Sequence, residues 1–78
     1  MNNLIQKRVV KIHKLILRQN TGTPAEFAAT LNISRSHLYN IIDDLKISGA
    51  EIKYSRKWQT FYYNNSFSLE IDTIKILT

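Results

Sequence analysis

The sequence has no cysteine, only two glycines, one proline and no long apolar run. Without cysteine, neither a disulfide framework nor a thiolate metal site can stabilise the fold, so packing has to do so. No run of about 18 apolar residues could span a bilayer, and the first residues lack the apolar stretch and cleavage site of a secretory signal. We therefore expect a cytoplasmic protein with no membrane partner.

Residues suited to catalysis or to cofactor binding are also scarce. His13 and His37 have no second ligand at the spacing of a zinc site, and two glycines cannot build a phosphate-binding G-x-x-x-x-G-K loop. Asp43 and Asp44 are neighbours, which diverge by about 100° on a helix and cannot form a catalytic pair. We expect no enzymatic activity, no catalytic residues, no metal and no cofactor.

Positive charge is what the sequence has in excess. Eleven Lys and Arg residues against six Asp and Glu residues give a formal net charge of +5 and a pI of about 9.8 in 78 residues. Five of the basic residues precede the first acid, Glu26. This balance favours a polyanionic partner, although basic charge can also serve solubility alone.

The first segment predicts an amphipathic helix from residue 2 to about residue 20. Its apolar face consists of Ile5, Val9, Ile12 and Ile16. Its opposite face is basic and consists of Lys7, Lys11, Lys14 and Arg18. We expect Gly22 to end this helix in the left-handed conformation.

Two shorter helices joined by about three residues follow, a pattern typical of a helix-turn-helix. The stretch "TPAE" at residues 23–26 predicts a capped helix start, with Thr23 as N-cap and Glu26 completing a capping box. The next helix starts after the N-cap Ser34 and ends at Gly49. The residues expected to face inward are Ala25, Phe27, Ala28 and Leu31 in one helix and Leu38, Ile41, Ile42 and Leu45 in the other.

After residue 49 the apolar spacing changes from helical to alternating, which predicts a β-hairpin with its turn at residues 56–59. Ile52, Tyr54, Phe61 and Tyr63 alternate with polar residues and with Thr60 and Tyr62. Residues 67–71 alternate again and predict a third strand, and the conformation of residues 73–78 stays open. The expected fold class is α+β, a winged helix-turn-helix of three helices, a hairpin and a C-terminal strand, with one domain at 1–65 and an apolar extension at 66–78.

The start of the third helix differs in charge from the start of the second. A helix start has unpaired N–H groups and about half a positive charge. Glu26 neutralises that charge in the second helix, whereas the third begins with Arg35, Ser36 and His37. This indicates a place for an anion such as a phosphate. The alternative is that Ser34 only caps the helix and Arg35 points into water.

The outward face of this helix suits the major groove of DNA. Ser36 and Asn40 lie opposite the apolar face. Asparagine side chains typically pair with adenine, and arginine side chains such as that of Arg35 pair with guanine. Tyr39 and His37 are better suited to phosphates. For each of these residues singly, a solvated surface role is the alternative.

The hairpin adds a second basic element, formed by Lys53, Arg56 and Lys57 beside Trp58, which we expect to be exposed. A basic, aromatic turn next to a recognition helix can grip the flanking backbone or the minor groove. The alternative is a hairpin whose charges protect a sheet edge from aggregation.

Two motifs bear a resemblance to a known family. They are A-x-x-L-N-I-S-R-S-x-L-Y, residues 28–39, and L-K-x-x-G-A-x-I-x-Y, residues 45–54. Together with the order of helices and hairpin, they resemble the winged helix-turn-helix domain of bacterial regulators of the DeoR, biotin-repressor and WYL-domain types. The resemblance implies that the third helix enters the major groove and that the hairpin acts as the wing.

We therefore expect a stand-alone, sequence-specific protein that binds double-stranded DNA, most simply a small bacterial transcription regulator. The expected DNA-binding residues are Thr23, Ser34, Arg35, Ser36, His37, Tyr39, Asn40, Lys53, Arg56 and Lys57. A homodimer through residues 67–77 would raise the affinity of so small a domain. Two alternatives are a winged helix used as a protein-interaction module and attachment of the basic first helix to a membrane surface.

Overall fold

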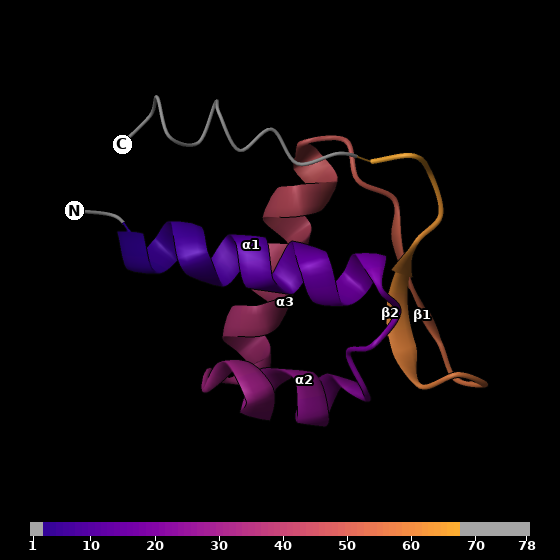
Figure 1. The fold of residues 1–78 in the computed structure, drawn as a ribbon, viewed down its shortest axis with the longest axis horizontal. Coiled ribbons are helices and arrows are strands. Elements are labelled where there is room, and N and C mark those ends of the chain that lie inside the picture. Colours follow the sequence, from indigo (N-terminus) through magenta and orange to yellow (C-terminus); the bar gives the residue numbers. More distant parts are fainter. Residues whose placement is uncertain (1–2, 68–78) are drawn as a thin grey trace.

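The computed structural model describes residues 3–67 of the chain. Three helices, α1 (Asn3–Leu17), α2 (Pro24–Leu31) and α3 (Arg35–Ile47), precede two strands, β1 (Ile52–Ser55) and β2 (Thr60–Tyr63). Figure 1 shows α1 crossing in front of α3, with α2 below them and the hairpin to one side. The α+β class is confirmed, and the arrangement is compatible with a winged helix.

The C-terminal expectations fall almost entirely outside the described part of the chain. Phe67, where the predicted third strand begins, is described and lies in neither a helix nor a strand. Residues 68–78, and with them the rest of that strand and the dimer contact expected from it, lie outside the described residues. The sheet formed within residues 3–67 consists of β1 and β2.

The end of α1 differs from the sequence expectation. The helix ends at Leu17, and Gln19 takes the left-handed conformation with φ of 54°. The amide of Gln19 donates to the carbonyl of Ile16 and that of Asn20 to the carbonyl of Leu15, both at 3.0 Å. These bonds satisfy carbonyls of the last turn and offset the cost of positive φ at a residue other than glycine. The expectation that Gly22 caps α1 was therefore wrong.

Gly22 is needed for a different reason. It has φ of 75° and lies beside the start of α2, where a Cβ atom would come within 2.7 Å of Oε1 of Glu26. That carboxylate oxygen accepts a hydrogen bond from the amide of Thr23 at 2.9 Å, and the Thr23 hydroxyl accepts one from the amide of Glu26 at 3.2 Å. The predicted capping box is confirmed, and glycine leaves room for it.

The joint between α2 and α3 spans residues 32–34. Asn32 is left-handed with φ of 58°, and its amide donates to the carbonyl of Ala29. Ser34 then caps α3 by accepting a hydrogen bond from the amide of His37 at 3.0 Å. The short joint holds the two helices at a fixed angle, because both of its ends are hydrogen-bonded.

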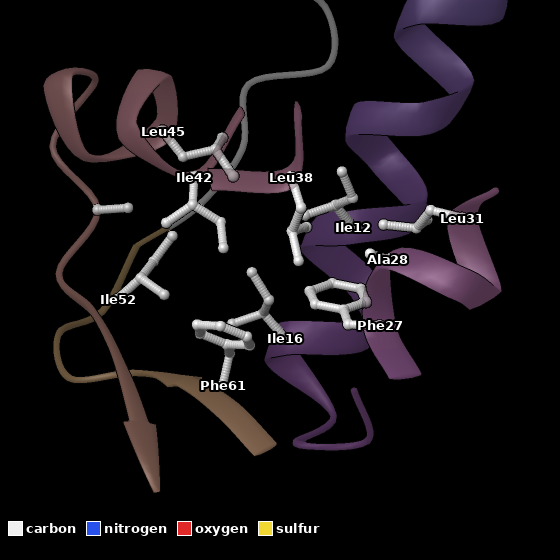
Figure 2. Packing of buried hydrophobic residues seen from close by; sticks show 11 residues of the cluster. Ile12, Ile16, Phe27, Ala28, Leu31, Leu38, Ile42, Leu45, Ile52 and Phe61 are labelled. Atoms are coloured by element: carbon white, nitrogen blue, oxygen red, sulfur yellow. The ribbon is translucent and has the colours of Figure 1, made fainter. Parts of the chain in front are cut away.

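All three helices and both strands contribute to one core. Its members are Ile12, Ile16, Phe27, Ala28, Leu31, Leu38, Ile42, Leu45, Ala50, Ile52 and Phe61. Figure 2 shows these side chains converging from the helices and the hairpin. Each large side chain that is fully buried contributes about 1.5–3 kcal/mol. Three expected core residues differ, because Ala25 is exposed and Val9 and Ile41 are only half-buried.

The hairpin has the predicted boundaries and turn. Ile52 pairs with Tyr63 and Ser55 with Thr60, and residues 56–59 form the turn, which we call the hairpin tip. Thr60 departs from the alternation of buried and exposed residues. It is only 2% exposed, and its neighbour Phe61 is buried as well. The linker between α1 and α2 covers Thr60 and bonds to it through Thr21. Within the described residues, no helix is both long and apolar enough to cross a membrane.

Candidate nucleic-acid interface

One face of α3 is polar and exposed to solvent. The core takes Leu38, Ile42 and Leu45 from the other face. The exposed set contains every residue predicted from this helix to contact DNA: Arg35, Ser36, His37, Tyr39 and Asn40. Their common surface follows from the helical period, because the apolar residues at spacings of three and four define the buried side.

The start of α3 is positively polarised. The helix has no acid in its first turn, and Arg35, Ser36 and His37 are all exposed there. Ser34 caps the helix by accepting from the amide of His37. Ser34 therefore caps α3 while the cation of Arg35 stays exposed. Capping by Ser34 does not remove the positive partial charge of the helix start. The partial charge of about +0.5 at the helix start adds to that of Arg35.

Tyr39 connects α3 to the hairpin. Its ring meets that of Phe61 edge-on, with centroids 6.4 Å apart and planes at 72°. Phe61 in turn lies 5.0 Å from Tyr54 and 5.8 Å from Phe27, measured between ring centroids. Because Tyr39 is 43% exposed, its side chain is shared between the surface and the packing of the hairpin. This contact places the hairpin next to the exposed face of α3.

The hairpin tip is a basic, aromatic projection. Arg56, Lys57 and Trp58 are exposed, as is Lys53 on β1. The side chain of Trp58 is 70% exposed, and Nζ of Lys57 lies 5.1 Å from its ring centroid. In Figure 1 the tip and the start of α3 lie toward the same end of the molecule, where α2 also lies. The expected exposure of Trp58 is confirmed.

Thr23 lies in a less open setting than the other predicted residues. It is half-buried, and its hydroxyl and amide are both engaged by Glu26 in the capping box. The carboxylate of Glu26 next to it would repel a phosphate. The structure therefore leaves the other nine predicted residues exposed on the surface of α3, its cap and the hairpin, and it places Thr23 beside an acid.

The basic face of α1 is not part of that surface. Lys7, Lys11, Lys14 and Arg18 are exposed, whereas Ile12 and Ile16 are fully buried. These isoleucines share one core with the buried face of α3, and Figure 1 shows α1 crossing in front of α3. The exposed sides of the two helices therefore face away from each other across that core. The sequence predicted both basic surfaces but not that the fold separates them.

Part of the α1 charge lies beside the end of α2. Lys7, Arg8 and Lys11 line a groove of about 190 Å³ together with Thr30 and Leu31 from the end of α2. The last turn of α2 has no basic residue of its own. A helix end has a partial negative charge, which is favourable for cations such as those that α1 contributes to this groove.

An unpredicted polar contact links α1 to β2. Nδ1 of His13 and the hydroxyl of Tyr63 lie 2.7 Å apart, and the ring of Phe67 packs on both side chains. Burial lowers the pKa of His13 below its usual value of 6.5 and raises the pKa of Tyr63 to about 12. Because these two residues are 50 positions apart in the sequence, only the fold identifies the partner of His13.

Within residues 3–67, no three His, Cys, Asp or Glu side chains come together in a way that could hold a metal ion. Comparison of the chain with protein-family models, with curated proteins and with solved structures gives no match. The features that bear on function are thus those of the molecule itself: a polar helix face with a positive start, and a basic hairpin with a tryptophan at its tip.

Proposed function

We propose that this protein is a winged helix-turn-helix that binds double-stranded DNA and acts as a small transcription regulator. The observation on which the proposal rests is that the exposed face of α3 and the basic hairpin are neighbours, in contact through Tyr39 and Phe61. Binding by one helix and one wing needs that adjacency.

The dimensions of α3 suit the major groove. Its 13 residues make a helix roughly 20 Å long, and the groove of B-DNA admits an α-helix. Arg35, Ser36 and Asn40 would contact base edges, while Tyr39 and His37 contact phosphates. The hairpin would add phosphate contacts on the flanking backbone from Lys53, Arg56 and Lys57.

The acids of α3 define which half of the helix enters the groove. Asp43 and Asp44 are both exposed and lie in its C-terminal half. A carboxylate close to phosphates is unfavourable, so the N-terminal half would lie deepest and the acids would lie where the helix leaves the DNA. This orientation also directs the positive helix start toward the phosphates.

The proposal is tested by titrating labelled duplex DNA with the protein at several salt concentrations. We expect the affinity to fall steeply with salt, because phosphate contacts release counterions. Arg35→Ala and Asn40→Ala should each weaken binding to a selected site by roughly 5- to 150-fold, the usual worth of a base contact. Tyr39→Ala is a poorer probe, because it also removes the packing against Phe61.

The matched control is Thr30→Ala, an exposed position on α2 in the groove next to α1, which should leave affinity unchanged. Circular dichroism of each variant checks that the fold is intact. An affinity that does not change with salt concentration contradicts the proposal. So does an affinity that neither Arg35→Ala nor Asn40→Ala lowers. Selection from random DNA then shows whether the preferred site is a palindrome, as a dimer requires.

A second candidate function is a protein-interaction module. It is favoured by the C-terminal end of α3, where Ile47 is 85% exposed close to Asp43 and Asp44. An apolar residue beside acids suits a protein partner better than a phosphate backbone. A pull-down with and without nuclease separates the two functions, because a partner held through DNA is released on digestion.

A further inference from the structure

The tryptophan at the hairpin tip has no role in the core. Trp58 is 70% exposed, and its indole lies next to the ammonium group of Lys57. An exposed aromatic ring that projects from a turn beside cations has the flat face and the charges with which proteins stack on nucleic-acid bases. We propose that Trp58 stacks into a base step of the bound DNA as a wedge, so that the preferred ligand is duplex DNA that unstacks easily at that step. This inference rests on the proposed DNA binding.

The charge around the indole identifies the kind of ligand. Arg56 and Lys57 precede it, and the sequence has no acid between Glu51 and Glu70. A protein partner with an apolar pocket would leave these cations without counter-charges. Nucleic acid combines a flat aromatic face with a phosphate on either side of it, so it satisfies the ring and the cations together.

The hairpin tip is held in a fixed conformation, which favours insertion of its side chain between bases. The amide of Trp58 donates to Oγ of Ser55 at 3.1 Å, and Gln59 closes the turn with φ of 50°. Thr60, directly behind the tip, accepts a hydrogen bond from the amide of Thr21 at 3.1 Å. The tip is therefore anchored to the linker between α1 and α2, and less conformational entropy is lost when the indole is inserted.

Insertion has a cost that depends on the DNA. Separating one base step costs a few kcal/mol, and the cost is smallest at pyrimidine–purine steps, mismatches and bulges. A wedge therefore generates selectivity for deformable DNA at a position that α3 does not contact. The hairpin lies beside the exposed face of α3, so the deformed step should lie to one side of the site that α3 reads.

The experiment uses the fact that Trp58 is the only tryptophan in the chain. The full-length protein is titrated into a short mixed-sequence duplex at low salt, and into the same duplex with a single-nucleotide bulge. Anisotropy of dye-labelled DNA measures binding, and tryptophan emission from the same samples reports on the tip alone. We expect emission to be quenched at saturation and the bulged duplex to bind more tightly.

Two variants test whether the indole is responsible. Trp58→Ala should lose roughly 5- to 150-fold in affinity for the bulged duplex and most of the preference for it, and Trp58→Phe should retain part of both. The matched control is Ile47→Ala, which removes another highly exposed apolar side chain and should change neither.

The outcomes separate this inference from the proposed function. Binding with unchanged emission, or a Trp58→Ala variant that keeps the parent's affinity and its preference for the bulged duplex, overturns the wedge while DNA binding stands. Absence of any binding by anisotropy overturns both. A blue shift of the emission that grows with protein concentration in the absence of DNA assigns Trp58 to an interface between copies of the chain, and also overturns the wedge.

Discussion

Two threonines that are 39 positions apart hold the α1–α2 linker against β2. The hydroxyl of Thr21 accepts a hydrogen bond from the amide of Phe61 at 2.9 Å, and the amide of Thr21 donates to the hydroxyl of Thr60. Both threonine side chains are buried. At the scale of single residues, this pair explains why the hairpin stays next to the helices although the sheet formed within residues 3–67 has only two strands.

Replacing Thr21 tests that pair. Thr21→Val keeps the shape of the side chain but leaves the buried amide of Phe61 without an acceptor, so the free energy of unfolding should fall by about 1–3 kcal/mol. Urea denaturation measures the change. Thr30→Val, at an exposed position, is the control and should stay within about 0.5 kcal/mol of the parent. Equal stability of the two variants would show that the linker is held by packing alone.

The pKa of His13 predicts how stability depends on pH. Burial lowers this pKa in the folded state, so the unfolded state binds more protons than the folded state near and below its own pKa of about 6.5. The contribution of His13 is complete above that pH and is lost as the pH falls toward the lowered value. The free energy of unfolding should therefore decrease between about pH 7.5 and about pH 5.5.

His13→Gln provides the comparison for that prediction, because glutamine does not titrate. The difference in unfolding free energy between parent and variant should shrink as the medium is acidified. A difference that stays constant over this range would contradict the lowered pKa of the half-buried His13 beside Tyr63.

At the scale of secondary structure elements, Ser34 has two separable properties. Its side chain caps α3, and it lies at the helix end that we propose to approach phosphates. Asparagine and aspartate cap as well as serine does, but only aspartate adds a negative charge. Substitution of one residue can therefore distinguish the stability of α3 from its binding.

We expect Ser34→Ala to lower the free energy of unfolding by about 1 kcal/mol, because the amide of His37 loses its acceptor. Ser34→Asn and Ser34→Asp should keep near-parental stability in thermal denaturation. In DNA titrations, Ser34→Asp should bind at least roughly ten-fold more weakly than Ser34→Asn, because it places a carboxylate at the anion-binding helix end. Equal DNA affinity of these two variants would place the start of α3 away from the backbone.

For the whole molecule, the decisive feature is that its two basic surfaces lie on opposite sides. If α3 and the hairpin bind DNA, the basic face of α1, whose buried side meets that of α3 in the core, would point away from the same duplex. It would then add to the long-range attraction of the positively charged protein rather than touch the DNA.

Paired double variants test this orientation. Arg56→Gln with Lys57→Gln should reduce the slope of log affinity against log salt by about 1–2, because each phosphate that a cation no longer neutralises lowers the slope by about one unit. Lys11→Gln with Lys14→Gln removes the same charge from α1 and should leave the slope nearly unchanged. If the α1 variant reduces the slope as much as the hairpin variant does, the proposed docking face is wrong.

Local sequence patterns predicted the elements well. The capping residues Thr23, Glu26 and Ser34 and the alternation in the hairpin depend on neighbours a few positions away, so they could be read directly. The exposed face of α3 followed for the same reason. The end of α1 was missed, because Gln19 takes a left-handed conformation that favours glycine and is offset by two turn hydrogen bonds.

By itself the sequence determined the α+β class, the helix starts, the hairpin and the identity of the polar residues on α3, since each depends on local spacing and capping. Only the tertiary structure decided which basic groups share a surface, what covers Thr60 and what His13 touches. Those relations join residues that lie far apart in the chain, such as Thr21 with Thr60 and His13 with Tyr63. They arise because one small core must be closed by all five elements at once, and local periodicity does not encode that packing.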